Sequence, residues 1–231
     1  MIGGLRDGLQ MASRMTWRRA RNAARIFQSF QASRIRKEPF INGMPNSISI
    51  EPTTACNLRC PECPSGLRAF SRPTGMLREG LYRNVIDQIA PTLSYLTFYF
   101  QGEPYLHPSF PDMVGYATSK GIYTATSTNA HFLNEEAARD TVKSGLDRLI
   151  ISIDGTTQAA YESYRIGGSL EKVIAGTRNI LAAKKGLRSG TPHVVFQFLV
   201  VKPNEHQIPE VYKLSRELGV DQVVLKTAQI Y

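Results

Sequence analysis

From about residue 47 the chain alternates short runs of β-branched and aromatic residues with segments of helical periodicity. This alternation is typical of βα units, in which each helix leads back to the start of the next parallel strand. Two of the runs, at 148–153 and 193–201, are hydrophobic at nearly every position, as expected for strands buried on both faces. The pattern predicts six strands, at residues 47–51, 96–101, 123–127, 148–153, 193–201 and 222–226.

The helices between these strands have recognisable start and stop signals. Asn134, followed by two glutamates, opens a helix that Gly145 closes, and another helix at 209–218 ends before Gly219. Right-handed crossovers of this kind close a sheet into a full or partial barrel or leave it open and doubly wound. The pattern therefore predicts one α/β domain over residues 47–231 and leaves these architectures open.

The first 46 residues have a different character. Residues 1–40 contain nine Arg and Lys residues against two acidic ones, so they carry +7 of the formal net charge of +9. Residues 37–46, with two prolines and a glycine, predict a linker. Because the other 191 residues carry only +2, nucleic acid is not an expected partner.

Apolar residues between the arginines predict that this basic N-terminal arm is an amphipathic helix. We expect the arm to dock on the following domain or, as a minor hypothesis, to make peripheral contact with an anionic membrane. The apolar surface would come from Leu5, Leu9, Ala12, Met15, Ala23, Ile26, Phe27 and Phe30.

All three cysteines of the chain, Cys56, Cys60 and Cys63, lie within eight residues. An odd number at such short range argues against a disulfide framework and favours a reducing compartment with a metal or redox role. No uninterrupted apolar run reaches the length of a membrane helix or a signal-peptide core. We therefore predict a cytoplasmic protein.

The cysteine loop, Cys56-Asn57-Leu58-Arg59-Cys60-Pro61-Glu62-Cys63, follows the first predicted strand. Three thiolates can ligate three irons of a cubane cluster, which leaves the fourth iron open to an amine and a carboxylate. A zinc site would need a fourth ligand from one of four histidines, none at close motif spacing. A thioredoxin-type dithiol would leave Cys56 unused, and a ferredoxin would need a fourth cysteine.

The three-then-two spacing of these cysteines resembles that of the radical S-adenosylmethionine (radical SAM) superfamily. The segment Tyr161-Glu162-Ser163-Tyr164-Arg165-Ile166-Gly167-Gly168, followed by Val173 and Gly176, is similar to the branch that carries a C-terminal SPASM domain. The resemblance implies a partial (βα)6 TIM-type barrel with a [4Fe-4S] cluster on Cys56, Cys60 and Cys63. It also implies that the reduced cluster cleaves S-adenosylmethionine to a 5′-deoxyadenosyl radical, which abstracts a hydrogen from the substrate.

Other residues after predicted strands acquire roles through this resemblance. Gln101-Gly102-Glu103-Pro104 is similar to a Gly-Gly-Glu-Pro segment of the family that holds the ammonium of S-adenosylmethionine, with Gln101 replacing the first glycine. Asn129 could be only a helix cap and Asp154 only part of a turn. The cofactor-binding residues that the resemblance implies are Gln101, Gly102, Glu103, Asn129, Ser152, Asp154 and Arg165.

Position supports this set, because the cysteine loop, Glu103, Asn129 and Asp154 all follow the C-terminal ends of different predicted strands. In βα barrels that rim is where sites are built. Strand alternation also sends Ser152 and Asp154 to one face. The resemblance implies that their partner there is the ribose and methionyl part of the nucleoside.

The expected substrate is a peptide or, less favoured, a small molecule, with flavodoxin or ferredoxin as electron donor. The alternatives are a non-catalytic iron-sulfur or zinc-binding module and a truncated, inactive fragment. No helix follows the sixth predicted strand and no SPASM-type cysteines are present, so we expect a radical SAM domain, residues 47–231, that is truncated after that strand.

Overall fold

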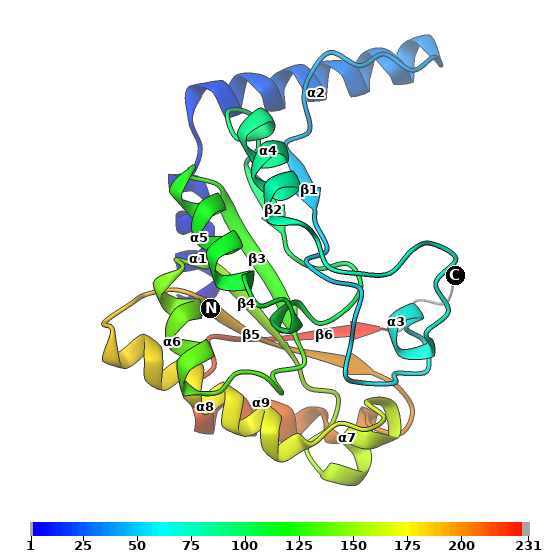
Figure 1. Ribbon diagram of the computed structural model, residues 1–231, viewed down its shortest axis with the longest axis vertical. Coiled ribbons are helices and arrows are strands. Elements are labelled where there is room, and N and C mark those ends of the chain that lie inside the picture. Colours follow the sequence, from blue (N-terminus) through cyan, green and yellow to red (C-terminus); the bar gives the residue numbers. More distant parts are fainter. Residues whose placement is uncertain (1, 228–231) are drawn as a thin grey trace.

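The computed structural model describes residues 2–227, with side chains from Gly4 onward, and within them six parallel strands form one sheet. The strands are neighbours in chain order, so every connection is a crossover to the adjacent strand (Figure 1). Their bounds are β1 (Ser47–Ser49), β2 (Tyr95–Thr97), β3 (Tyr123–Thr128), β4 (Arg148–Ser152), β5 (His193–Val200) and β6 (Gln222–Thr227). This sheet confirms the predicted α/β fold and agrees with a partial TIM-type barrel.

The first two strands are shorter than predicted. They end at Ser49 and Thr97, because the residues that follow leave the ladder and turn into the cysteine loop and toward Gly102, whose φ is +80°. The predicted end of the chain, Ala228–Tyr231, lies outside the described residues.

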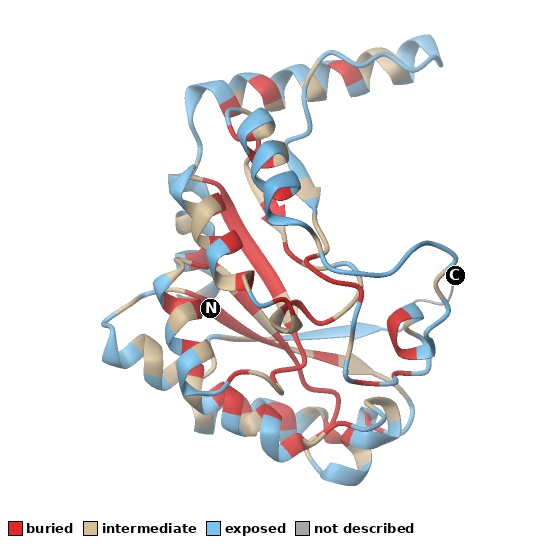
Figure 2. Ribbon diagram, in the orientation of Figure 1, coloured by how far each residue is buried: buried red, intermediate tan, exposed pale blue. Residues whose placement is uncertain are grey.

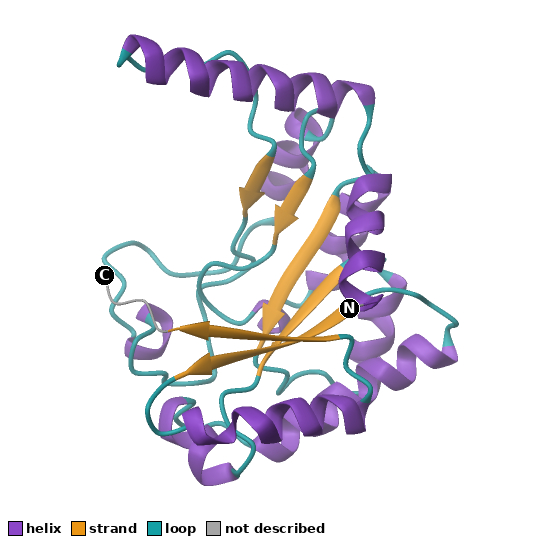
Figure 3. Cartoon of the chain, turned by 180° about the vertical axis from the view of Figure 1, so that it is seen from behind, coloured by secondary structure: helices purple, strands orange, loops and turns teal. Residues whose placement is uncertain are grey.

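Helices follow the strands and cover the outer side of the sheet, as the view from behind shows (Figure 3). The covering helices are α4 (Glu79–Ile89), α5 (Phe110–Ser119), α6 (Glu135–Lys143), α8 (Leu170–Gly186) and α9 (Ile208–Leu218). The short helix α3 (Pro64–Leu67) lies instead in the loop region beside the C-terminal ends of the strands, and α7 (Gln158–Tyr164) packs on α8. Two 3-10 turns are η1 (Pro104–Leu106) and η2 (Glu205–Gln207). The predicted caps are confirmed: the Asn134 side chain accepts from Ala137 N at 2.8 Å, and Gly219 ends α9 with φ of +83°. Gly145 directly follows Ser144, the C-cap of α6.

The core lies between the helices and the central strands (Figure 2). Phe98, Ile151 and Phe196 are fully buried, as is Phe110 of α5, which contacts Phe98 edge to face. The edge strand β6 differs, because Val224 and Leu225 are exposed. Burial on both faces is therefore a property of the inner strands and does not extend to β6.

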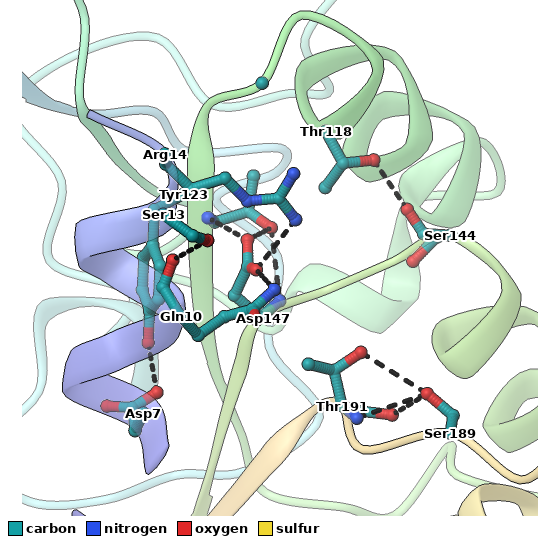
Figure 4. Close-up of polar contacts among 12 residues, drawn as sticks. Asp7, Gln10, Ser13, Arg14, Thr118, Tyr123, Ser144, Asp147, Ser189 and Thr191 are labelled. Atoms are coloured by element: carbon teal, nitrogen blue, oxygen red, sulfur yellow. Dashed lines mark hydrogen bonds and ion pairs between the residues drawn. The ribbon is translucent and has the colours of Figure 1, made fainter. Parts of the chain in front are cut away.

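The N-terminal arm forms two helices, α1 (Ile2–Ser13) and α2 (Trp17–Arg36), and α1 docks against the N-terminal edge of the sheet (Figure 4). The buried Asp147 carboxylate accepts from Gln10 Nε2 and Arg14 Nη2, each at 3.0 Å, and from Thr124 N at 2.9 Å. Among residues 2–227 no helix is long and apolar enough to span a membrane. The division of the chain at residue 46 stays a prediction.

Candidate radical-cofactor site

The cysteine loop begins after β1 and ends in the short helix α3. Cys63 is the residue before α3 and Pro64 its first residue, so the proline sets the helical φ where no N–H bond is needed. A Cβ on Gly66 would lie 2.4 Å from Cys60 O, so only glycine lets α3 pack this closely on the loop. All three cysteines are free; Cys60 is buried, and Cys56 and Cys63 are half-buried.

Burial also affects the thiols. It raises the pKa of Cys56 to about 11, an effect reduced by the Leu58 N–H near its sulfur, and it raises the pKa of Cys60. Both are therefore protonated in the metal-free protein at neutral pH. Because metal ligation requires thiolates, binding of a metal centre here must release protons.

The loop after β2 packs directly on the cysteine loop. Gly102 N donates to Ser65 Oγ at 2.9 Å, and Glu103 N donates to Ala55 O at 2.7 Å. A Cβ on Gly102 would lie only 2.1 Å from Thr53 O, and the positive φ already disfavours other residues. The glycine is thus required for the two loops to meet.

Glu103 is 2% exposed, and both of its carboxylate oxygens accept hydrogen bonds. Oε1 accepts from Thr128 Oγ1 at 2.7 Å and from Tyr105 N at 3.3 Å, and Oε2 accepts from Asn129 N at 2.8 Å. Burial raises the pKa of Glu103 to about 7, and the bonds from Asn129 and Thr128 partly offset the rise. The sequence did not predict these three protein donors. The carboxylate therefore joins the exits of β2 and β3, and its contact with an ammonium stays a prediction.

Asn129 follows β3 and connects it to the cysteine loop. Its Nδ2 donates to Asn57 Oδ1 at 2.7 Å, and its Oδ1 accepts from His131 N at 3.1 Å. Both the nitrogen and the oxygen of the Asn129 amide are therefore hydrogen-bonded. The N-cap of α6 is Asn134 and not Asn129.

Arg165 comes from the far side of the site, where α7 ends. Its Nε donates to Asp154 Oδ2 at 2.5 Å, and its Nη1 lies 3.8 Å from Cys60 Sγ. Burial lowers the pKa of Arg165, but the charges of Asp154 and Cys60 outweigh that effect and raise it overall. The adjacent Ile166 O accepts from Arg59 N at 3.0 Å, so this segment packs on the cysteine loop.

Two predicted residues have contacts that the sequence did not indicate. Asp154 is 1% exposed and lies behind Arg165, where its Oδ1 accepts from Leu199 N at 2.7 Å, because β4 has ended at Ser152 and strand alternation no longer applies. Gln101 turns toward the cysteines: its Oε1 lies 3.3 Å from both Cys63 Sγ and Ser65 Oγ. Chain order offered no signal for either contact.

A cavity of about 140 Å³ lies among these groups. Nine of the ten predicted site residues line it, and Asp154 alone does not. The lining residues are Cys56, Leu58, Cys60, Cys63, Ser65, Gly66, Tyr99, Phe100, Gln101, Gly102, Glu103, Ser127, Thr128, Asn129, Ser152 and Arg165. A larger hollow of about 370 Å³ shares Cys56 and Ser65 with it.

The donor set fits a cluster better than a single zinc ion. Among the described residues no three His, Cys, Asp or Glu side chains surround one point. Three histidines are engaged elsewhere: His107 with Leu77 O, His131 with Ser169 N and His193 with Gln222, while His206 is exposed in η2. Three separate thiols around a polar cavity instead suit separate irons of one cluster.

A parallel βα sheet with three cysteines at its C-terminal rim defines a class, the barrel enzymes that use an iron-sulfur cluster at the strand exits. Residues 50–215 match the family model described as "Radical SAM superfamily", and the chain belongs to that superfamily. Membership implies a [4Fe-4S] cluster and S-adenosylmethionine as cofactors. The family prediction from the cysteine spacing is therefore confirmed.

Individual relatives agree with this assignment. The PqqA peptide cyclase of Gluconobacter oxydans is 32% identical over 81% of this chain and 50% of its own length. The AdoMet-dependent heme synthase of Methanosarcina barkeri is 28% identical over 76% and 48%. The chain thus spans about half the length of the curated relatives it matches.

Solved structures show the same fold. SuiB of Streptococcus suis, bound to the precursor peptide SuiA, superposes with a TM-score of 0.69 at 14% identity, over 87% of this chain and 43% of SuiB. The structure titled native anSMEcpe with bound AdoMet gives a TM-score of 0.65 at 20% identity, over 80% and 52%. At these identities the likeness concerns the fold alone.

Proposed function

We propose that this chain is the radical-generating domain of a peptide-modifying enzyme. Cys56, Cys60 and Cys63 would hold the [4Fe-4S] cluster, and the adjoining cavity would hold the methionine end of S-adenosylmethionine. The observation that carries this proposal is the convergence of the three thiols with Glu103, Asn129, Ser152 and Arg165 on one cavity. Bound together, the two cofactors supply one-electron cleavage of the sulfonium to a carbon radical.

The residues of this chain would bind and orient the cofactors and shield the reactive intermediate from water. Three protein donors leave one lone-pair direction on the Glu103 carboxylate for an ammonium. Arg165 is held by Asp154, so its guanidinium can donate toward the Cys60 sulfur without a loss of charge pairing. The apolar core beneath the rim limits access of water to a reactive intermediate.

The substrate class rests on the relatives. One is named a PqqA peptide cyclase, and SuiB is solved with a precursor peptide, which supports a peptide substrate. The relative named a heme synthase keeps a small-molecule substrate as the second candidate. We further propose flavodoxin or ferredoxin as reductant and the cytoplasm as the location, since three free cysteines suit a reducing compartment.

The first prediction concerns the cluster. Protein reconstituted without oxygen should bind about four irons and four sulfides and, with dithionite and S-adenosylmethionine, release 5′-deoxyadenosine. Cys56→Ala, Cys60→Ala and Cys63→Ala should each abolish both, while Glu62→Ala, an exposed change in the same loop, should preserve both. Stoichiometric zinc without labile sulfide would contradict the proposal.

A second prediction concerns the ammonium. Glu103→Gln keeps the shape of the side chain and removes its charge, so it should leave the cluster intact and weaken S-adenosylmethionine binding about tenfold to a hundredfold. Calorimetry on reconstituted protein measures this, with Glu79→Gln, an exposed surface change, as the matched control. Equal affinities in the wild type and Glu103→Gln would show that Glu103 serves only to join the loops.

A further inference from the structure

The arm leaves much of its apolar surface uncovered. Of twenty large hydrophobic side chains exposed among the described residues, eleven lie between Leu5 and Met44. The same segment has the chain's highest density of arginine. Exposed apolar residues normally occur singly, so this concentration calls for a partner.

One face of α2 is already occupied. Arg19 is buried and donates to Gly121 O, Ala90 O and Lys120 O of the domain. Asn22 exchanges two hydrogen bonds with the backbone of Met44, and Ser29 Oγ accepts from Asn42 N at 2.9 Å, so the linker runs back along the helix. Ala23 and Ile26, which the sequence assigned to the apolar surface, are half-buried on this side.

The opposite face of α2 is open. Trp17 is 79% exposed, Phe27 62% and Ile35 82%, and at about 100° per residue they fall within an arc of about 80° on the helix. Arg18, Arg21, Arg25 and Arg36 follow on one side of this stripe and Arg34 on the other, all exposed. Between Asp7 and Glu38 there is no acidic residue. Figure 1 shows α2 at one end of the molecule, beyond the strands.

We propose that this face of α2 lies on the surface of an anionic lipid bilayer. An apolar stripe bordered by arginines is the arrangement that lets a helix rest at the headgroup level, with its cations near lipid phosphates. Tryptophan is favoured at that depth. A nucleic acid would match the charge but would leave Phe27 and Ile35 without a role, and a second copy of this basic arm would repel the first.

Trp17 is the only tryptophan of the chain, so its emission reports on this face in the unmodified protein. Vesicles of phosphatidylcholine with phosphatidylglycerol should shift the emission to the blue and protect it from iodide, whereas vesicles of phosphatidylcholine alone should not. The double change Arg21→Gln with Arg25→Gln should weaken partitioning about thirtyfold, the loss expected for two cations near an anionic surface. Arg139→Gln with Arg178→Gln, on exposed positions of α6 and α8, should leave it unchanged.

A second set of variants tests the contribution of the apolar stripe on α2. Phe27→Ser with Ile35→Ser should abolish the blue shift, while Tyr212→Ser on α9, a residue 38% exposed at the other end of the molecule, should keep it. An unshifted emission with anionic vesicles would overturn the proposal. So would a shift produced equally by duplex DNA, or one that grows with protein concentration in the absence of lipid. The measurement does not need the cluster, so it stands apart from the test of radical chemistry.

Discussion

Both ends of the strands in the parallel sheet carry an ion pair whose carboxylate is buried, but the two pairs serve different purposes. At the C-terminal edge Asp154 holds Arg165, whose guanidinium also lies 3.8 Å from Cys60 Sγ and borders a cavity. At the N-terminal ends of the strands Asp147 pairs with Arg14, the residue after α1, and so fastens the arm to the sheet. A buried charge alone therefore does not mark a site. What distinguishes Arg165 is its second contact, with the sulfur of Cys60 beside a cavity that all three cysteines line.

The largest expected effect is a difference in stability between variants of these two ion pairs. Asp154→Ala leaves the half-buried Arg165 guanidinium without a counter-charge and Leu199 N without an acceptor, so it should lower the free energy of unfolding by about 3 kcal/mol. Asp147→Ala should cost less, about 1 to 3 kcal/mol, because Arg14 is on the arm and can turn to water. Urea denaturation of the metal-free proteins, followed by circular dichroism, compares them. A larger loss in Asp147→Ala would mean that the arm is a main support of the sheet.

The next largest expected effect is a pH dependence of the free energy of unfolding, caused by Glu103 at the C-terminal ends of the strands. Burial raises the pKa of Glu103 from its usual 4.5 to about 7, so between these values the folded protein holds a proton that the unfolded chain releases. The stability that this provides is fully present below about pH 4.5 and is lost as the pH rises through about 7, in total about 3 kcal/mol.

Unfolding curves of metal-free protein between about pH 5 and pH 8 measure that loss. Glu103→Gln should reduce the change in the free energy of unfolding over this pH range. Glu79→Gln, a change at an exposed residue of α4, should retain it. Curves of wild type and Glu103→Gln that run parallel would show that the carboxyl titrates near its usual pKa.

The comparison also shows what sequence can predict. Chain order and periodicity predicted that the cysteine loop, Glu103 and Asn129 would meet, because the exits of parallel strands share one rim. Asp154 follows the end of β4 at Ser152 and does not line this cavity, because its carboxylate is held by Arg165 and Leu199 N; its contact with the cofactor stays a prediction.

The periodicity of the sequence could not predict which side chains from distant segments would bond to each other. The bond from Asn129 to Asn57 spans 72 positions, and the three donors to Glu103 come from the end of β3 and from η1. In the arm, an apolar pattern could not show which face of α2 the linker would cover, because that depends on hydrogen bonds between the side chains of Asn22 and Ser29 and the backbone of the linker.

The smallest expected effect concerns Gln101, which stands where a glycine was expected and reaches Cys63. The amide oxygen lies 3.3 Å from Cys63 Sγ, and when Cys63 is a thiolate ligand the amide must present its N–H group instead. A donor to sulfur stabilises the more negative, reduced cluster. Gln101→Ala should therefore shift the midpoint potential of the reconstituted protein to more negative values by about 40 mV, corresponding to about 1 kcal/mol for a one-electron couple. Redox titration followed by electron paramagnetic resonance measures the shift without turnover, and Gln88→Ala, an exposed change on α4, is the control. Gln101→Glu should move the potential further in the same direction, because it places a negative charge beside the sulfur. If both variants titrate like the wild type, the glutamine only fastens α3 through Ser65, and the cluster is insensitive to it.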